Sequence, residues 1–242
     1  MNFFQNPSKP ATTEGRLLAR PMQPSQTAPL GLQPLELDSD RDGFLYVPIG
    51  YRVDQPAPLV LMLHNAGSNA KDGLLPFQHL ADTQGLILLA PTSRSGTWDI
   101  LLNRYGPDIA FIDQALMQTF SRYAIDIRHV AIEGFSDGAS YALSVGITNG
   151  DLFTHIIAFS PEFIAPTLSR GKPRLFLSHG RWDNILPVRQ CSRKIVPLLE
   201  RAGYDVLYRE FYGFHTVPNA IAHEASDWFL SQEGAYLQPQ MH

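Results

Sequence analysis

The sequence predicts a doubly wound α/β fold, with a mostly parallel, twisted β-sheet and helices on both of its faces. Short apolar runs alternate with helix-length segments between residues 59 and 230, which is typical of βαβ units. One strand-to-helix junction reads Gly134-Phe135-Ser136-Asp137-Gly138, a turn tight enough to require glycine on both sides. Earlier in the chain, two apolar runs flank a polar turn, which predicts an antiparallel hairpin. We therefore expect a single domain over 32–242.

The expected elements follow one another with short connections. Residues 1–31 hold five prolines among Gln, Ser and Thr and are expected to form an irregular N-terminal extension, in which 16–19 could add a short edge strand. The hairpin pairs 32–37 with 44–48 across the turn 38–43, whose residues tolerate positive φ. No segment is long enough for a large cap domain, so we expect an open site. The remaining strands are expected at 59–63, 86–89, 129–133, 156–159, 174–178 and 206–211, and the helices at 73–83, 108–123, 139–148, 188–202 and 217–230.

The composition narrows the range of partners. With a net charge of −4 and 19 Lys and Arg scattered along the chain, no basic face is predicted for nucleic acid. No apolar run approaches the ~18 residues of a membrane-spanning helix, so no membrane span is expected. Cys191 is the one cysteine, and the N-terminus lacks the pattern of a secretory signal. We expect a cytoplasmic location, and a homodimer is left open because no stretch identifies its interface.

Four sequence patterns bear on metals and cofactors. Residues 38–43 match the start of a calcium-binding EF-hand loop, but the twelfth position is Ile49 instead of a bidentate Glu, so a solvated hairpin turn is favoured. His223-Glu224 lacks a second histidine one helical turn later, and neither the Rossmann glycine fingerprint nor a P-loop occurs. The sequence therefore predicts no metal and no cofactor.

The tight turn at 134–138 also predicts a chemistry. It follows the apolar run 130–132 and precedes a helix of small residues, which is the context of a nucleophile elbow, a turn that exposes a serine hydroxyl above the sheet. A serine hydroxyl is a weak nucleophile at neutral pH, so it needs a histidine to accept its proton and an acid to orient that histidine. We therefore interpret Ser136 as the nucleophile of a serine hydrolase.

The base and the acid are expected after Ser136, in the order acid and then histidine. His215 follows the predicted strand 206–211, in a loop at the carboxyl end of the sheet, where active sites of open α/β folds collect. Asp183 follows the predicted strand 174–178 and projects from the same edge. His223 and His242 fit surface positions better, and His155 lies at the start of a strand, away from the site. We predict His215 as the base and Asp183 as the acid.

An oxyanion hole requires two backbone N–H donors directed at the carbonyl oxygen on which charge develops. The N–H of Asp137, at the start of the elbow helix, is one candidate. The other is expected from the loop after the strand 59–63, which reads His64-Asn65-Ala66-Gly67, and we assign it to Ala66. For His64 itself we favour a hydrogen bond that shapes the loop over a role in proton transfer.

The elbow and the oxyanion loop, together with 179–187 (HGRWDNILP) and 213–218 (GFHTVP), resemble the phospholipase/carboxylesterase group of the α/β-hydrolase fold and predicted esterases similar to polyhydroxybutyrate depolymerases. The resemblance spans about 43–230. It implies a cofactor-free esterase acting on carboxylic or thioester bonds. Asn65 departs from the family pattern, which has Gly there; Asn tolerates the left-handed region, but its side chain could narrow or polarise the site. Phe214 replaces a common glycine and could cover the acyl pocket.

Several side chains near these motifs are candidates for substrate binding. Trp98, Phe135 and Trp182 lie beside site segments, although each could serve as ordinary core; Asn65 and Phe214 complete the set. Together they favour an apolar or aromatic substrate. We expect a carboxylesterase that forms an acyl-enzyme on small to medium, uncharged aryl or acyl esters. The alternatives are a thioesterase or lysophospholipase-type hydrolase, and a non-catalytic ligand-binding protein of the same fold.

Overall fold

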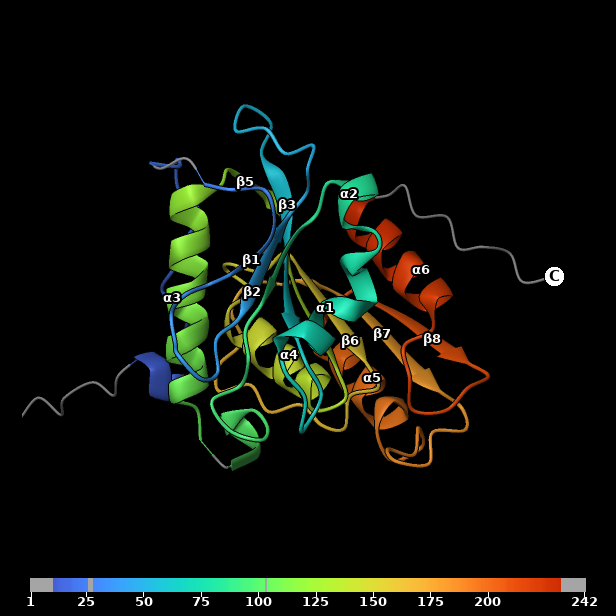
Figure 1. Cartoon of the computed structure of the whole chain (residues 1–242). Helices are drawn as coiled ribbons and strands as arrows, with labels where there is room; N and C mark the ends of the chain where they lie inside the picture. Colours follow the sequence, from blue (N-terminus) through green and yellow to red (C-terminus); the bar gives the residue numbers. More distant parts are fainter. Residues whose placement is uncertain (1–10, 26–27, 103, 232–242) are drawn as a thin grey trace, which may run out of the picture.

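An eight-stranded sheet forms the centre of the molecule (Figure 1). The computed structural model describes residues 11–25, 28–102 and 104–231. The strand order is β1-β2-β4-β3-β5-β6-β7-β8; β2 pairs antiparallel with β1 and β4, and the other neighbours are parallel. The predicted parallel sheet with an antiparallel N-terminal hairpin is confirmed. The strands are β1 (Gly31–Pro34), β2 (Phe44–Val47), β3 (Ala57–Leu63), β4 (Ile87–Ala90), β5 (Ile125–Phe135), β6 (His155–Phe159), β7 (Arg174–Gly180) and β8 (Val206–Phe211).

Helices cover both faces of the sheet, because its central strands are apolar on both sides; β6, for example, is buried at every residue. One core joins the sheet to α3 (Pro107–Arg122), α4 (Asp137–Thr148) and α5 (Ser192–Arg201). The second core joins it to α1 (Ala70–Gln78), α2 (Ala81–Gln84) and α6 (Asn219–Leu230). Two short 3-10 helices, η1 (Ala11–Glu14) and η2 (Asp99–Leu102), complete the described elements. Within the described ranges, none of the helices combines the length and apolar character needed to cross a bilayer.

The predicted helix 73–83 forms as two separate helices. α1 begins earlier, at Ala70, because the side chain of Asn69 accepts a hydrogen bond from the Lys71 N–H at 2.9 Å and so caps the helix. α2 ends at Gln84 and is capped by Gly85, whose φ of 69° is left-handed, a conformation that glycine adopts without strain. Because α1 starts at Ala70, it directly follows the loop that contains His64.

The first strand is shorter than the predicted 32–37. β1 ends at Pro34, and two residues later Glu36 has a φ of 58°, which takes the chain out of the extended conformation. The carboxylate of Asp42 accepts hydrogen bonds from the N–H groups of Glu36 and Leu37 at 2.8 and 3.2 Å. The turn thus satisfies backbone groups that a longer strand would have paired.

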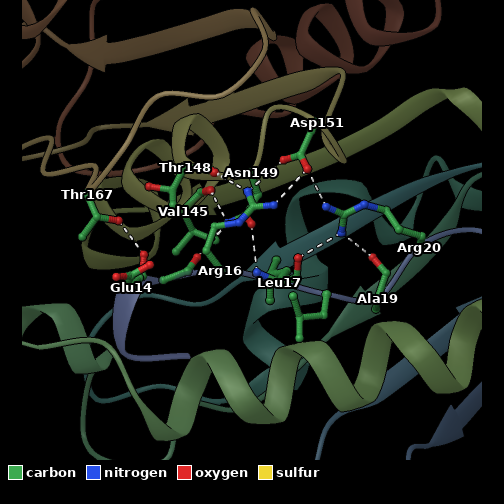
Figure 2. A network of polar contacts seen from close by, with 12 residues as sticks. Glu14, Arg16, Leu17, Ala19, Arg20, Val145, Thr148, Asn149, Asp151 and Thr167 are labelled. Atoms are coloured by element: carbon green, nitrogen blue, oxygen red, sulfur yellow. Dashed lines mark hydrogen bonds and ion pairs between the residues drawn. The ribbon is translucent and has the colours of Figure 1, made fainter. Parts of the chain in front are cut away.

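Residues 16–19 form no strand, contrary to the short edge strand considered for them; they pack as an irregular segment against α3 and α4. Leu17 is fully buried, and its N–H donates to the side chain of Asn149 at 2.9 Å. Arg16 forms an ion pair with Asp151 at 2.8 Å, and Figure 2 shows this network. The side chains of Asp113 on α3 and of Asn149 just after α4 accept the backbone N–H groups of 17–19 that a neighbouring strand would otherwise pair.

Candidate active site

The turn between β5 and α4 holds Ser136 in an unusual backbone conformation. Ser136 has φ 58° and ψ −121°, a region that residues other than glycine seldom adopt. The flanking glycines leave no room for side chains: a Cβ on Gly134 would lie 2.2 Å from the carbonyl oxygen of Gly138, and a Cβ on Gly138 would lie 2.2 Å from that of Leu63. The Ser136 N–H donates to the carbonyl of Phe159 at 2.9 Å. The turn therefore fixes Ser136 at the carboxyl end of β5.

His215 lies between Ser136 and Asp183 in one hydrogen-bonded chain. The Ser136 hydroxyl oxygen is 2.9 Å from His215 Nε2, and His215 Nδ1 is 2.6 Å from Asp183 Oδ2. With Nδ1–H donating to the carboxylate, Nε2 carries the lone pair that accepts the Ser136 O–H. The Asp183 side chain is fully buried, so its attraction for the imidazole is weakly screened by water. The structure thus brings together the three side chains that the sequence predicts to act together.

Adjacent strands position the acid and the base. Asp183 follows β7, His215 follows β8, and these strands are parallel neighbours. The two loops also contact each other directly, since the N–H of Trp182 donates to the carbonyl of Gly213 at 3.0 Å. A Cβ on Gly180 would lie 2.5 Å from that same carbonyl oxygen. The approach of the loops therefore depends on glycine at the end of β7.

A second histidine, His179, supports the acid loop, and sequence reasoning assigned it no role. Its Nδ1 lies 2.7 Å from the hydroxyl of Ser192, and its Nε2 lies 2.7 Å from the carbonyl of Leu186 and 3.3 Å from Asp183 Oδ2. Burial lowers the pKa of His179. The neutral ring can accept the Ser192 O–H at Nδ1 and donate from Nε2. The available signal was its place at the end of a predicted strand, just ahead of Asp183.

The loop after β3 is held in place by His64. The N–H of Ser93 donates to His64 Nε2 at 3.0 Å, which leaves the proton on Nδ1, and Nδ1 lies 2.7 Å from the Asn65 carbonyl oxygen. Burial lowers the pKa of His64. Both ring nitrogens are occupied by the backbone, which is the loop-shaping arrangement expected from the sequence. Nearby, the N–H of Gly67, whose φ is 70°, donates to the Gly96 carbonyl at 2.7 Å.

Two backbone N–H groups, one in the loop after β3 and one directly after Ser136, have no acceptor within the part of the chain that the structure describes. They belong to Ala66, in the loop that His64 holds, and to Asp137, at the first turn of α4. The Asp137 carboxylate accepts a hydrogen bond from the Thr97 hydroxyl at 2.7 Å, which fixes its side chain. These are the donors that the sequence predicts for an oxyanion hole.

A cavity of about 440 Å³ lies next to these residues, between α1 and the start of α6. Asn65 and Phe135, both predicted to contact substrate, line it, and so does Thr216, which directly follows the base. The Phe135 ring lies 4.7 Å from the His215 ring, centroid to centroid. The cavity is therefore continuous with the surroundings of the base.

The other aromatic candidates lie elsewhere. Trp98 is fully buried, its indole N–H donates to the His64 carbonyl at 2.9 Å, and its ring stacks on Tyr141. Trp98 therefore packs against the loop that contains His64. Its side chain is enclosed by the core and does not line the cavity. Trp182 and Phe214 are 55% and 62% exposed, with ring centroids 6.0 Å apart. They form a surface cluster beside the acid and base loops and line no part of the cavity.

Comparison with known proteins supports the same architecture. No protein-family model matches the chain. The bifunctional acetylxylan esterase/xylanase XynS20E of Neocallimastix patriciarum is 28% identical over 166 residues, or 65% of this chain and 23% of that protein. Probable feruloyl esterase C of Aspergillus niger is 28% identical over 155 residues, or 61% of this chain and 56% of that protein. The chain thus spans less than two thirds of the length of each relative. The crystal structure of esterase PE8 superimposes with a TM-score of 0.61 and 24% identity, covering 76% of this chain and 97% of that chain.

Proposed function

From the α/β-hydrolase fold of this chain, and from the three side chains that meet at one edge of its sheet, we propose that the protein is a serine carboxylic ester hydrolase. The observation that carries the proposal is the hydrogen-bonded chain from Ser136 through His215 to Asp183, with distances of 2.9 and 2.6 Å. A non-catalytic ligand-binding protein would have no physical need for this arrangement. The names of the two relatives, both esterases in part or in whole, agree with it.

The first half of the reaction forms an acyl-enzyme. The Ser136 oxygen attacks the ester carbonyl carbon as its proton passes to His215 Nε2, and the carbonyl π electrons move onto the oxygen. The N–H groups of Ala66 and Asp137 donate to that oxyanion, an interaction for which each donor typically contributes about 10²-fold to 10³-fold in rate. The carbon–oxygen bond to the leaving alcohol then breaks, and His215 gives that alcohol its proton.

The second half returns the enzyme to its starting state. His215 takes a proton from a water molecule, whose oxygen attacks the acyl carbonyl carbon. The same two N–H groups hold the new oxyanion, the bond to Ser136 breaks, and the proton on His215 returns to the Ser136 oxygen. Asp183 keeps the imidazole oriented and stabilises its protonated form throughout. No metal or cofactor is required by these steps.

We propose small to medium, uncharged esters with an aryl or short acyl group as the substrates. No lysine or arginine belongs to the described wall of the cavity, and Asp72 is part of that wall, so a carboxylate or phosphate on the substrate would be repelled. Phe135 offers an aromatic surface next to His215. The names of the relatives, an acetylxylan esterase and a feruloyl esterase, fit an acetyl or a hydroxycinnamoyl acyl group.

The test compares the parent protein with the variant Ser136→Ala on p-nitrophenyl esters from acetate to palmitate and on methyl ferulate. We expect hydrolysis by the parent, an optimum among the short or aryl esters, and loss of activity in the variant. Labelling with a fluorophosphonate probe should occur at Ser136 in the parent alone. A folded parent protein that hydrolyses none of these esters and takes up no probe would contradict the proposal.

Two further expectations concern the setting of the enzyme. We propose a cytoplasmic location, because the chain has one cysteine, Cys191, which is buried and free, and no disulfide is needed to hold the fold. Fractionation of cells that produce the full-length protein tests this expectation. The homodimer left open by the sequence is tested by light scattering after size-exclusion chromatography.

A further inference from the structure

Glu133 is a buried carboxylic acid that the proposed reaction does not use. It lies on β5 just before the Ser136 turn, on the same face of the sheet as Ala131 and Phe135. The residue is 1% exposed. Neither carboxyl oxygen has a hydrogen-bond partner among the residues that the structure describes. Buried polar groups are nearly always hydrogen-bonded, so an unpartnered acid at this depth calls for a partner that binds from outside the chain.

The cavity beside the active site lies on this face of β5. Glu133 belongs to its inner wall, which the sheet supplies, whereas Asp72 and Pro76 contribute from α1 and Asn219 from the start of α6. The cavity also shares Asn65 and Phe135 with the surroundings of the nucleophile. A group attached to an ester that is bound at Ser136 could therefore reach Glu133.

The surroundings of Glu133 favour its neutral form. Burial raises the pKa of Glu133 well above its ordinary value, and no cationic side chain lines the described cavity wall to offset a negative charge. A neutral carboxyl group has one O–H donor and a carbonyl acceptor. The best matched ligand group is a hydroxyl, which donates and accepts in the same way, whereas an anion would meet Asp72 as well as the acid.

We propose that this cavity is a specificity subsite in which the Glu133 carboxyl group hydrogen-bonds a neutral hydroxyl group on the ester substrate, such as a phenol or sugar hydroxyl. The inference rests on the proposed esterase function and deepens it. An ester that lacks the hydroxyl leaves the carboxyl group unpaired in the complex, and sites built to pair with a substrate hydroxyl discriminate strongly against such analogues. Glu133 would thus select among esters that the same Ser136 chemistry can cleave.

Binding to the variant Ser136→Ala tests the subsite without requiring turnover. Titration calorimetry would compare methyl 4-hydroxycinnamate with methyl cinnamate, and methyl 4-O-acetyl-β-xyloside with its 3-deoxy analogue, so that the phenol and the sugar are separate arms. In at least one arm we expect the hydroxylated ligand to bind about tenfold more tightly or better. Adding Glu133→Leu should abolish the preference, whereas Glu133→Gln, which keeps a donor and an acceptor, should retain most of it.

One control variant and one alternative measurement test whether the binding preference depends on Glu133. Glu200→Leu makes the same chemical change at an exposed position of α5 and should leave the preference intact. If Glu133→Leu does not fold, infrared difference spectra remain decisive: binding of the hydroxylated ligand should shift the carbonyl stretch of a protonated carboxyl group, and Glu133→Gln should remove that band.

The outcomes separate the subsite from the esterase proposal. Equal binding of both members in both arms, or a preference that survives Glu133→Leu, would overturn the subsite even if Ser136-dependent hydrolysis is found. Tighter binding of methyl 4-(aminomethyl)cinnamate, which carries an ammonium group, would overturn it in favour of an ionised acid. A preference that depends on Glu133 in a protein that hydrolyses no ester would instead contradict the esterase proposal alone.

Discussion

The imidazole of His179 lies 3.3 Å from the carboxylate of Asp183, and both side chains are fully buried. The same carboxylate lies 2.6 Å from His215 and also accepts hydrogen bonds from the N–H groups of Ile185 and Leu186, at 3.0 and 2.8 Å. His179 meets the Leu186 carbonyl as well. His179, Asp183 and Leu186 thus contact one another within the segment 179–186. These contacts set the orientation of the Asp183 carboxylate.

His179→Ala should consequently impair catalysis more than substrate binding. Without the imidazole, the loop that carries Asp183 can shift, and displacements of about 1 Å in catalytic groups cost up to roughly 10²-fold in rate. We expect kcat to fall by about 10-fold to 100-fold with little change in KM on p-nitrophenyl acetate. His179→Gln, which can still donate to Leu186, should recover part of the loss. Unchanged kcat in folded His179→Ala protein would show that the contact serves packing only.

Gly138→Ala should damage both the fold and the site. The added Cβ would lie 2.2 Å from the Leu63 carbonyl oxygen, so α4 must move away from β3 and carry the N–H of Asp137 with it. We expect a loss of about 1 to 3 kcal/mol in the free energy of unfolding, together with reduced esterase activity. Gly96→Ala is the control, because a Cβ there meets nothing within 4 Å. Urea unfolding and initial rates measure the two effects, and equal behaviour of the two variants would contradict the argument.

Different parts of this structure were predictable to different degrees. The strands and the turn at Ser136 could be predicted because apolar runs and paired glycines are local features. The contacts of Trp98 could not, because its burial depends on Tyr141, which lies on a distant helix. Glu133 stands in an ordinary strand pattern, and no local feature indicates that its carboxyl group lacks a partner. The contacts of Trp98 and the missing partner of Glu133 both depend on tertiary packing, which the local residue pattern does not indicate.

Acid should destabilise the protein through His155, which is buried at the start of β6. Burial, followed by the positive charge of Arg174, lowers the pKa of His155 from 6.5 to about 3. The unfolded chain therefore binds a proton that the folded chain excludes between these values, so the contribution is complete above pH 6.5 and declines as the pH falls towards 3. The slope approaches about 1.4 kcal/mol per pH unit. His155→Gln should flatten the difference between urea unfolding at pH 7 and pH 4.5, whereas His223→Gln, at an exposed position, should not.

Asn149 should contribute more to stability than the neighbouring ion pairs. Its buried amide accepts from the Leu17 N–H at 2.9 Å and donates to the carbonyl oxygens of Gly15 and Val145 at 2.8 and 2.9 Å (Figure 2). Asn149→Ala leaves the Leu17 N–H and the Gly15 carbonyl unpaired, whereas the Val145 carbonyl keeps its bond from the backbone N–H of residue 149, and we expect a loss of about 2 kcal/mol in the free energy of unfolding.

Asp151→Asn is the matched comparison for this prediction. Asp151 pairs with Arg16 and Arg20, but its side chain is 37% exposed, and pairs at that exposure contribute about 1 kcal/mol or less. Urea unfolding of both variants is measured at about 0.1 M and about 0.5 M NaCl, because the higher salt concentration screens exposed charges more strongly. The comparison separates the two cases. The loss in Asn149→Ala should be independent of salt, because no net charge is removed. A larger or equal loss in Asp151→Asn would show that charge, and not the buried amide, holds the N-terminal segment against α4.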